Sequence, residues 1–506
     1  MSATIASALT LSRRELLVLV AAFALSLPAV TPRIYASDEI QYFSYLRSLW
    51  FDRDVSFENE YQHFYEQNIG RGEGFHATFL EAYTEAGRRP SFATIGCALL
   101  WMPFYAAGHA VAIARGYPTD GFSHPYIAAV AYGSAFYAFA AVLLSISAAR
   151  RVVGHGLAAG VIVWIGTPLL FYAYVSPPYS HACSAFAVAL FVTVWLRGRE
   201  SWTPAGAVAL GLTGALMAMV REQDVILLIG PAVDFFVTVV VHRDGSGCIN
   251  QRSRGPTPAR TSLAPSRSAA ATGAAESTSG LDPRQPGSPA FSRALLIAGA
   301  GLMAFLTGSL PQLLAYKALN GHYGPSRLVV RKMSWSAPHA WEVLASPQHG
   351  FLLWTPLAAI ALAGLVMLAL RSDSPARRVA GCALLMVAAQ IYVSGSVESW
   401  TVAGAFGQRR FVALTILLTI GLAAVLAVAR RTPWRAPVAI AIAIAVWWNL
   451  ALIAQFGTGM MNRQRLELGK NAYDAFITIP ALAPDLAGRY LFDRGSFYGR
   501  EQRRSP

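Results

Sequence analysis

An acidic pair directly after the first apolar segment is the feature of this sequence best suited to chemistry. Asp38 and Glu39 follow Ser37 and open an aromatic stretch over residues 37–50, whose apolar positions recur at helical spacing. A positioned carboxylate can remove a proton from a hydroxyl nucleophile as a general base. The stretch itself predicts an amphipathic helix in the membrane interface. Ser37 or Asp38 could equally be the N-cap of a solvated helix, so spacing alone leaves both interpretations open.

Arginines and one histidine supply the complementary positive groups. Arg221 and Arg409 each stand at the end of an apolar segment, Arg89 precedes Pro90, and His181 begins an apolar segment. A guanidinium stays charged in a poor dielectric and grips phosphate through two parallel hydrogen bonds. These residues are therefore candidates for binding an anion. Each arginine could instead place its charge among lipid headgroups, and His181 could make an interfacial hydrogen bond.

The composition indicates that these residues belong to a polytopic membrane protein. Of 506 residues, 55% are hydrophobic and only 13% are charged, whereas a soluble chain carries about 25% charged residues. Such a chain cannot cover itself with a polar surface, which argues against a soluble enzyme, a disordered protein and a disulfide scaffold. The net charge of +14 comes almost entirely from arginines in short loops. Nucleic-acid binding needs a continuous basic face, so no nucleic-acid partner is expected.

Eleven apolar segments are long enough to cross a bilayer, which takes roughly 20 residues per helix. Basic residues in short loops mark the cytoplasmic side. Every second loop along the chain is basic, as this rule requires, if the stretch 92–114 does not span the membrane. This stretch contains Pro103 and is then a re-entrant or interfacial helix. The N-terminus is then inside and the C-terminus outside. The predicted spans are 15–32, 126–148, 156–173, 180–196, 203–220, 224–241, 293–315, 351–370, 378–396, 411–429 and 437–456.

Four regions follow from this topology. Residues 1–241 form an N-terminal catalytic membrane module, with a large first outer loop at about 33–125 that contains interfacial helices. Residues 242–292 are rich in Ser, Pro, Gly and Ala, cannot bury a core, and are predicted to be a disordered cytoplasmic linker. Residues 293–456 hold the C-terminal spans, and 457–506 form an outer-face tail. The first apolar segment could instead be a cleaved signal peptide.

The stretch SDEIQYFSYLRSLWFDRD after the first span resembles the opening of the C-type (GT-C) membrane glycosyltransferases. The resemblance is to family 39 and the RgtA/B/C/D-like group, which take in protein mannosyltransferases and aminoarabinose transferases. Those chains also begin with a helix, an outer-loop Asp-Glu pair and a Tyr-containing amphipathic helix. Further segments similar to members of that group follow in the same order, and the whole covers about 30–430 without the linker. These segments are Tyr179-Ser180-His181, Arg221-Glu222-Gln223-Asp224, HGFLLWTP at 349–356 and GAFGQRRF at 404–411.

The resemblance implies a GT-C-type helical bundle and a reaction. Members move a sugar from a polyprenyl-phosphate donor to an acceptor at the outer face of the membrane, usually with inversion. Asp38 would be the catalytic base, and Glu39 would position it or join it in binding a divalent cation such as Mg²⁺ or Mn²⁺. The donor phosphate would be bound by Arg409, Arg221, Arg89 and His181.

The expected function is thus a glycosyltransferase of the plasma (inner) membrane, acting on a lipid, glycan or protein acceptor at the outer or periplasmic face. One departure concerns Arg89: many relatives carry Lys-Pro-Pro or His-Pro-Pro where this chain reads RRPSF over 88–92. The alternatives are a transporter or flippase of lipid-linked saccharide and a non-catalytic membrane assembly subunit. Transporters place charged or broken helices near the midplane. Here the ionisable residues cluster at span ends, which favours surface chemistry.

Overall fold

We describe the fold from a computed structural model of the chain. Helices make up about three quarters of the described residues, and the one β-pairing among these residues is an isolated bridge between Met333 and Val397. The chain is therefore an all-α protein, as predicted. The described residues are 11–70, 74–241, 289–336, 338–371, 375–402 and 404–498.

The N-terminal region, up to residue 241, contains α-helices and several short 3₁₀ or π turns that are labelled η. Its first elements are α2 (Arg13–Ser26), η1 (Leu27–Ala29), α3 (Ser37–Arg47), η2 (Ser48–Asp52), α4 (Glu58–Glu66), η3 (His76–Glu81), α5 (Gly96–Arg115) and α6 (His124–Val153). They are followed by α7 (Leu157–Gly166), α8 (Leu169–Tyr174), α9 (His181–Gly198), α10 (Pro204–Val220), η4 (Glu222–Leu228), α11 (Ile229–Phe235) and η5 (Phe236–Val241).

The C-terminal region begins inside the stretch predicted as a linker. Most of 242–292 lies outside the described residues, but 289–292 already belong to a helix. The elements up to the last long helix are α12 (Pro289–Gly308), α13 (Leu310–Asn320), α14 (Arg327–Arg331), α15 (Ala340–Ala345), α16 (Phe351–Trp354), α17 (Pro356–Ala369), α18 (Ala376–Ser396), η7 (Arg409–Leu414), α19 (Thr415–Ala429) and α20 (Arg435–Thr458). The tail contains α21 (Leu468–Tyr473), η8 (Asp474–Thr478), α22 (Ile479–Phe492) and α23 (Gly495–Tyr498).

Six of the described helices are long and apolar enough to cross a membrane, and the bent pair α12–α13 makes a seventh if it is one span. A multi-pass helical membrane protein is therefore supported, but eleven uninterrupted spans are not found. Thr167 and Pro168 divide the predicted span 156–173, and Thr355 divides 351–370. The helices that remain there, α7 and α17, have 10 and 14 residues, and α10 has 17.

The stretch expected to be interfacial, 92–114, contains the uninterrupted helix α5, which passes the length and hydropathy test for a span. It packs against α3, α10 and the beginning of α6. The Trp101 indole donates to Ser134, and the Tyr137 hydroxyl donates to the carbonyl of Leu100. Near its other end, a Cβ on Gly108 would lie 2.8 Å from the carbonyl oxygen of Pro125. Helix α5 thus runs beside about the first half of α6, and the re-entrant or interfacial placement of 92–114 stays a prediction.

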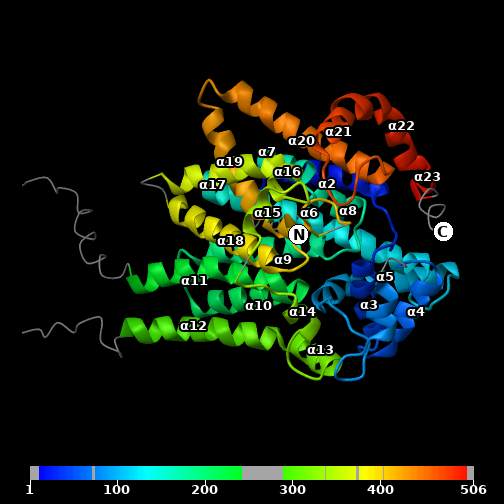
Figure 1. Cartoon of the computed structure of the whole chain (residues 1–506). Coiled ribbons are helices and arrows are strands. Elements are labelled where there is room, and N and C mark those ends of the chain that lie inside the picture. Colours follow the sequence, from blue (N-terminus) through cyan, green and yellow to red (C-terminus); the bar gives the residue numbers. More distant parts are fainter. Residues whose placement is uncertain are drawn as a thin grey trace, which may run out of the picture.

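The long helices lie side by side in one bundle, with a smaller lobe at one end (Figure 1). Helix α19 packs against α6 and α17. A Cβ on Gly364 of α17 would lie 1.9 Å from the Gly421 carbonyl oxygen of α19. Such close backbone contact at small residues is typical of membrane helices. We call the end that carries residues 241 and 289 the linker end, and the end that carries α3 and α4 the lobe end.

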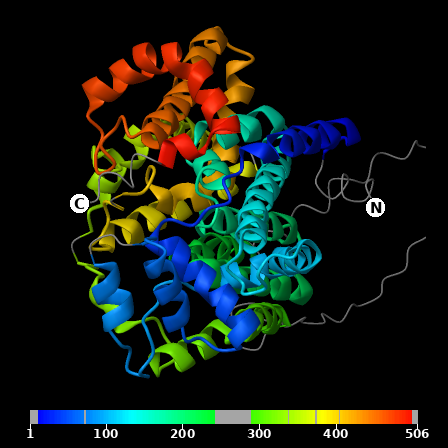
Figure 2. The same ribbon diagram turned by 90° about the vertical axis from the view of Figure 1, so that its right-hand side faces the viewer.

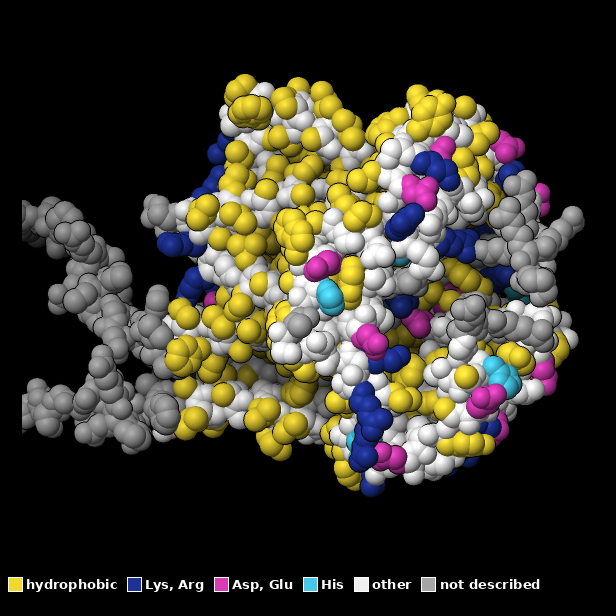
Figure 3. Space-filling model, viewed as in Figure 1, with side chains coloured by type: hydrophobic (Ala, Val, Ile, Leu, Met, Phe, Trp, Pro, Cys, Tyr) yellow, Lys and Arg dark blue, Asp and Glu magenta, His cyan; other side chains and the backbone are white. Residues whose placement is uncertain are grey.

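Charged side chains gather at the two ends. Hydrophobic side chains cover most of the visible bundle, whereas acidic and basic ones concentrate over the lobe end (Figure 3). At the linker end Arg199 pairs with Asp234, Arg151 pairs with Glu200, and Arg378 donates to Thr238. These three arginines belong to the loops that the charge rule places in the cytoplasm.

Helix α3 differs from the expected interfacial helix. Its residues Ile40, Phe43, Tyr45 and Leu46 are fully buried, and so is Ser44. The helix packs against α4 and α5, and it therefore lies enclosed within the lobe rather than with one face in lipid. Burial on several sides fixes the direction of its first turn, which carries the acidic pair.

The predicted first span is helical for only part of its length. Helix α2 runs beside the linker-end half of α6, where Glu15 pairs with Arg150 and the Phe23 ring stacks on Phe139 at 4.4 Å. Beyond Ala29 the chain is extended up to α3. Extended backbone in a membrane protein needs partners for its polar groups.

The C-terminal tail provides those partners. The Arg494 guanidinium donates to the carbonyls of Pro28 at 2.5 Å and Val30 at 2.6 Å, and the Tyr490 hydroxyl donates to the carbonyl of Ala29 at 2.9 Å. Figure 1 shows the tail and the lobe of α3 and α4 at the same end of the bundle, and Figure 2 looks onto that end, with the tail above and the lobe below. The tail thus packs on the chain that leads into the acidic pair.

We expect Arg494→Ala to lower the unfolding temperature, because it leaves the carbonyls of Pro28 and Val30 without their charged donor. Hydrogen bonds to charged groups contribute about 1.5–3 kcal/mol each. Arg489→Ala is the matched control, since Arg489 bonds only within the tail, to Ser496 and Asp485. Thermal unfolding in detergent measures both variants. Equal losses would contradict a special role for the Arg494 contacts.

Candidate functional site

The carboxylate of Asp38 is held at the lobe end by an arginine from the other half of the chain. Asp38 lies in the first turn of α3, and its Oδ2 pairs with Nη1 of Arg409 at the start of η7. The Asp38 side chain is 37% exposed and that of Arg409 is 20% exposed. The pair is therefore reachable from outside the bundle, and the structure brings together two residues that the sequence proposed for one site.

Glu39 has a different role from its neighbour. Its side chain is fully buried, and Oε2 accepts hydrogen bonds from the backbone N–H of Tyr35 at 2.8 Å and of Ala36 at 3.1 Å. Its Oε1 lies 2.6 Å from the Ser176 hydroxyl, which donates to it. Burial raises the pKa of Glu39 to about 7, despite these hydrogen bonds, which act in the opposite direction. Glu39 therefore caps the first turn of α3, the turn that carries Asp38.

This arrangement does not fit the expected Mg²⁺ or Mn²⁺ site. Both oxygens of Glu39 bind donors, and the cation beside Asp38 is already a guanidinium. In the described part of the chain no group of three or more His, Cys, Asp or Glu side chains is placed to hold a metal ion. A divalent cation prefers several oxygen ligands, and Asp38 alone cannot supply them. We derive no step that uses a metal.

His181 and Arg221 form the second part of the site. Nη1 of Arg221 lies 2.9 Å from Nδ1 of His181 at the head of α9. A guanidinium can only donate, so Nδ1 must accept and the imidazole proton must lie on Nε2. That Nε2 atom is buried and has no hydrogen-bond partner in the described structure. His181 thus holds an unused N–H donor, which suits an incoming anion.

Two tyrosines connect the histidine to the ion pair. The ring of Tyr179 lies parallel to that of His181, with centroids 5.5 Å apart, and the Arg409 guanidinium lies 5.6 Å from its centroid. The Tyr172 ring meets His181 edge-on at 4.4 Å. Its hydroxyl donates to the Phe406 carbonyl at 3.0 Å, which ties the segment before η7 to α8. These contacts hold Arg409 and His181 in one group.

Three arginines lie around His181, and the carboxylates of Asp38 and Asp224 lie near two of them. Arg221, Arg409 and Arg410 all act electrostatically on this histidine. Arg410 is 8% exposed, and its donors reach only neutral oxygens, those of Ser394 at 3.5 Å and Ser399 at 3.3 Å. A phosphate group is the kind of ligand that such a cluster can bind.

Arg89 is placed apart from this group. Its Nη2 donates to Glu58 at 2.6 Å, its guanidinium lies 4.0 Å from the Tyr83 ring centroid, and its side chain is largely buried. Within the described part of the chain, Arg89 contacts Ala82, Glu58 and Tyr83 rather than the acidic pair or the other candidate residues. The structure therefore brings together Asp38, Arg409, Arg221 and His181, and gives Arg89 a role in the packing of the lobe.

No family model matches the chain, and no curated protein matches it either. The function must therefore be argued from the geometry of the lobe end.

Sequence reasoning missed three residues that shape the site. Ser176 donates to Glu39, Tyr172 contacts His181, and Tyr42, one turn after Asp38, hydrogen-bonds Ser180. Ser176 directly precedes two prolines, which marks a structured turn before α9. Nothing in the sequence separates the two tyrosines from the aromatic residues that commonly anchor membrane helices.

We expect Glu39→Gln to fold normally, because the amide oxygen can still accept the two backbone N–H groups. Glu39→Ala should destabilise the protein by about 1–3 kcal/mol, since it leaves these donors and Ser176 without an acceptor. Because the folded-state pKa of Glu39 is raised, wild-type stability should fall as the pH rises from 4.5 to about 7. Thermal unfolding at several pH values compares the three proteins. Identical pH profiles for the wild type and Glu39→Gln would refute this assignment.

Proposed function

We propose that this protein is a membrane-embedded glycosyltransferase that moves a sugar from a polyprenyl-phosphate donor to a hydroxyl acceptor. The observation that supports it best is the position of Asp38, an accessible carboxylate beside Arg409 in a cationic group. A hydroxyl acceptor needs a base, and a phosphate leaving group needs fixed positive charge where its charge develops. Both are present within one group of side chains at the lobe end.

Each residue takes one part of the reaction in this proposal. The acceptor oxygen attacks the anomeric carbon of the sugar while Asp38 takes its proton. The bond between that carbon and the phosphate oxygen breaks, and polyprenyl phosphate leaves with the bonding electrons. Arg409 and Arg221 stabilise the phosphate, and Nε2 of His181 donates to one of its oxygens. Glu39 keeps the first turn of α3 in place.

The ion pair also determines the order of events. In the structure Arg409 pairs with Asp38. A donor phosphate that draws Arg409 toward itself leaves Asp38 without its counter-charge, and a carboxylate without a counter-charge is a stronger base. Donor binding thereby activates the base, so we expect the donor to bind before the acceptor is deprotonated.

The cellular setting belongs to the same proposal. The enzyme would lie in the plasma (inner) membrane with the lobe end on the outer or periplasmic side, because the loop arginines gather at the linker end. The acceptor would be an envelope lipid, glycan or protein. A transporter or flippase of lipid-linked saccharide and a non-catalytic assembly subunit are the alternatives, and the first experiment separates them.

Asp38→Asn should abolish sugar transfer, with a loss of about 10²–10⁴-fold expected for removing a general base. Donor binding should be at least as tight as in the wild type, since Arg409 loses its internal counter-charge. Release of polyprenyl phosphate is measured with purified protein in lipid, a panel of polyprenyl-phosphate sugars, and membrane extract as acceptor. Asp54→Asn is the control, because its carboxylate is similarly exposed, at 41%.

Full activity of Asp38→Asn would show that another group is the base. If the well-folded wild type releases polyprenyl phosphate from none of the donors, the result would favour the transporter or the subunit interpretation. Loss in both Asp variants would indicate damage to the lobe rather than to the reaction.

Arg409→Ala should raise the donor KM by about tenfold or more, because one charged hydrogen bond to phosphate contributes 1.5–3 kcal/mol. Arg409→Lys should recover only part of this, since an ammonium lacks the planar fork. Arg327→Ala is the control: this arginine is 65% exposed and pairs with Glu85. An unchanged donor KM in Arg409→Ala would exclude Arg409 from the donor site.

A further inference from the structure

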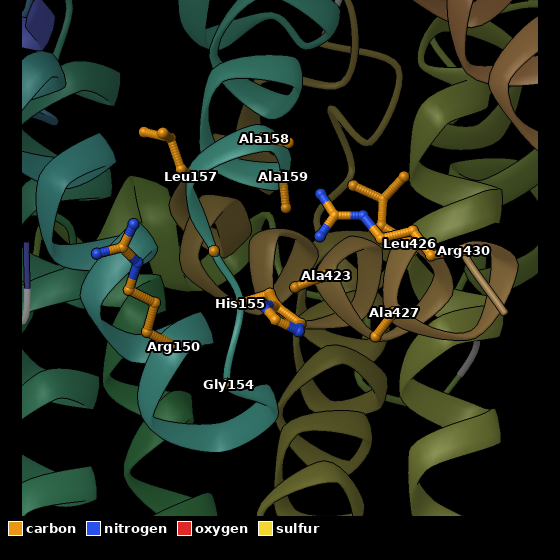
Figure 4. A pocket seen from close by; sticks show the side chains of 11 residues that line it. Arg150, Gly154, His155, Leu157, Ala158, Ala159, Ala423, Leu426, Ala427 and Arg430 are labelled. Carbon is orange, nitrogen blue, oxygen red and sulfur yellow. The ribbon is translucent and has the colours of Figure 1, made fainter. Parts of the chain in front are cut away.

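A cavity of about 280 Å³ lies at the linker end, far from the acidic pair. It is an open hollow between the end of α6, the start of α7 and the end of α19. Figure 4 shows the Arg430 guanidinium extending from α19 toward Ala159 of α7, with the His155 ring below it. Arg150 also lines the cavity, and no carboxylate does. The rest of the wall is backbone and small apolar side chains.

The turn between α6 and α7 shapes one wall of this cavity. Gly154 has φ of +88°, and a Cβ on Gly156 would lie 2.3 Å from the Ile146 carbonyl oxygen. These two glycines let the chain reverse tightly around His155. Gly156 is the N-cap of α7 and offers no side-chain cap, and the first backbone N–H bonded back to it is that of Gly160. The N–H groups before it therefore add positive potential at the cavity wall.

The cationic side chains of the cavity are not equivalent. Arg150 forms a bidentate ion pair with Glu15 of α2, so its charge is largely neutralised. No salt bridge between Arg430 and a described carboxylate is found, and the described residues that line the cavity with it include no acid. His155 adds an imidazole, which has at least one N–H donor in either protonation state. The cavity thus combines a guanidinium, an imidazole and a helix N-terminus without an opposing acid.

We propose that this cavity binds a phosphate group, with Arg430 and His155 as its ligands and the start of α7 as its third wall. The phosphate of an anionic lipid headgroup is the source that its position favours, because Arg431 and Arg435 also lie close to this end of the helices. Helix ends that carry unmatched arginines lie where headgroups are found. This site is separate from the proposed donor site and does not depend on the transfer reaction.

The test compares purified protein in vesicles of phosphatidylcholine alone and in vesicles that also contain phosphatidylglycerol. Unfolding temperature and the number of lipids retained in native mass spectrometry are measured, and inorganic phosphate is titrated separately in phosphatidylcholine. We expect phosphatidylglycerol to raise the unfolding temperature of the wild type. Arg430→Ala and His155→Ala should weaken retention, by about tenfold for the arginine.

The control is Arg431→Ala, which removes the same charge from the next residue without touching the cavity wall. Arg430→Lys keeps the positive charge and tests whether a loss in Arg430→Ala comes from misfolding. It should retain part of the lipid-dependent rise in unfolding temperature. A rise in unfolding temperature with inorganic phosphate but not with phosphatidylglycerol would support the anion site and would show that its ligand is soluble. Equal effects of Arg430→Ala and Arg431→Ala, or no effect of either, would overturn the proposal.

Discussion

The ion pair between Asp38 and Arg409 joins two parts of the chain that are 371 residues apart. Removing a carboxylate and a guanidinium from bulk water is costly, and their attraction must offset that cost. The surrounding structure fixes both ends of the pair. Glu39 caps α3 beneath Asp38, and the hydrogen bond from Tyr172 to Phe406 fixes the chain just before η7. A ligand that enters here must therefore offer Asp38 or Arg409 an interaction that replaces the one they now make with each other.

The convergence of Asp38, Arg409, Arg221 and His181 follows from facts visible in the sequence. Each stands where an apolar segment begins or ends, and the alternation of basic loops places these ends on one side. Arg89 satisfies the same criterion but lies elsewhere, because Glu58 and Tyr83 are closer partners for its guanidinium. Local partners of this kind depend on how the lobe packs, and residue spacing does not reveal them.

The helices show a similar division between what could and could not be predicted. Hydropathy located the apolar segments, because any buried or lipid-facing helix needs them. It could not show where these segments break, since apolar residues continue through Thr167 and Thr355. Nor could it show that the extended chain after α2 is stabilised by Arg494, which lies 464 residues from Val30. Backbone groups need partners, but the sequence does not say which distant side chain supplies them.

The arginines at the two ends of the bundle have different partners, and this difference affects which anions each end can bind. At the lobe end Arg409 already has a carboxylate partner, so an anion binds only if it interacts better than Asp38 does. At the linker end Arg430 has no acidic partner in the cavity, so nothing there has to be displaced. The first arrangement favours one well-fitting ligand, because only a group with matching geometry compensates for the broken pair. The second accepts any phosphate that reaches it, and the most abundant phosphate at a helix end in a membrane is a lipid headgroup.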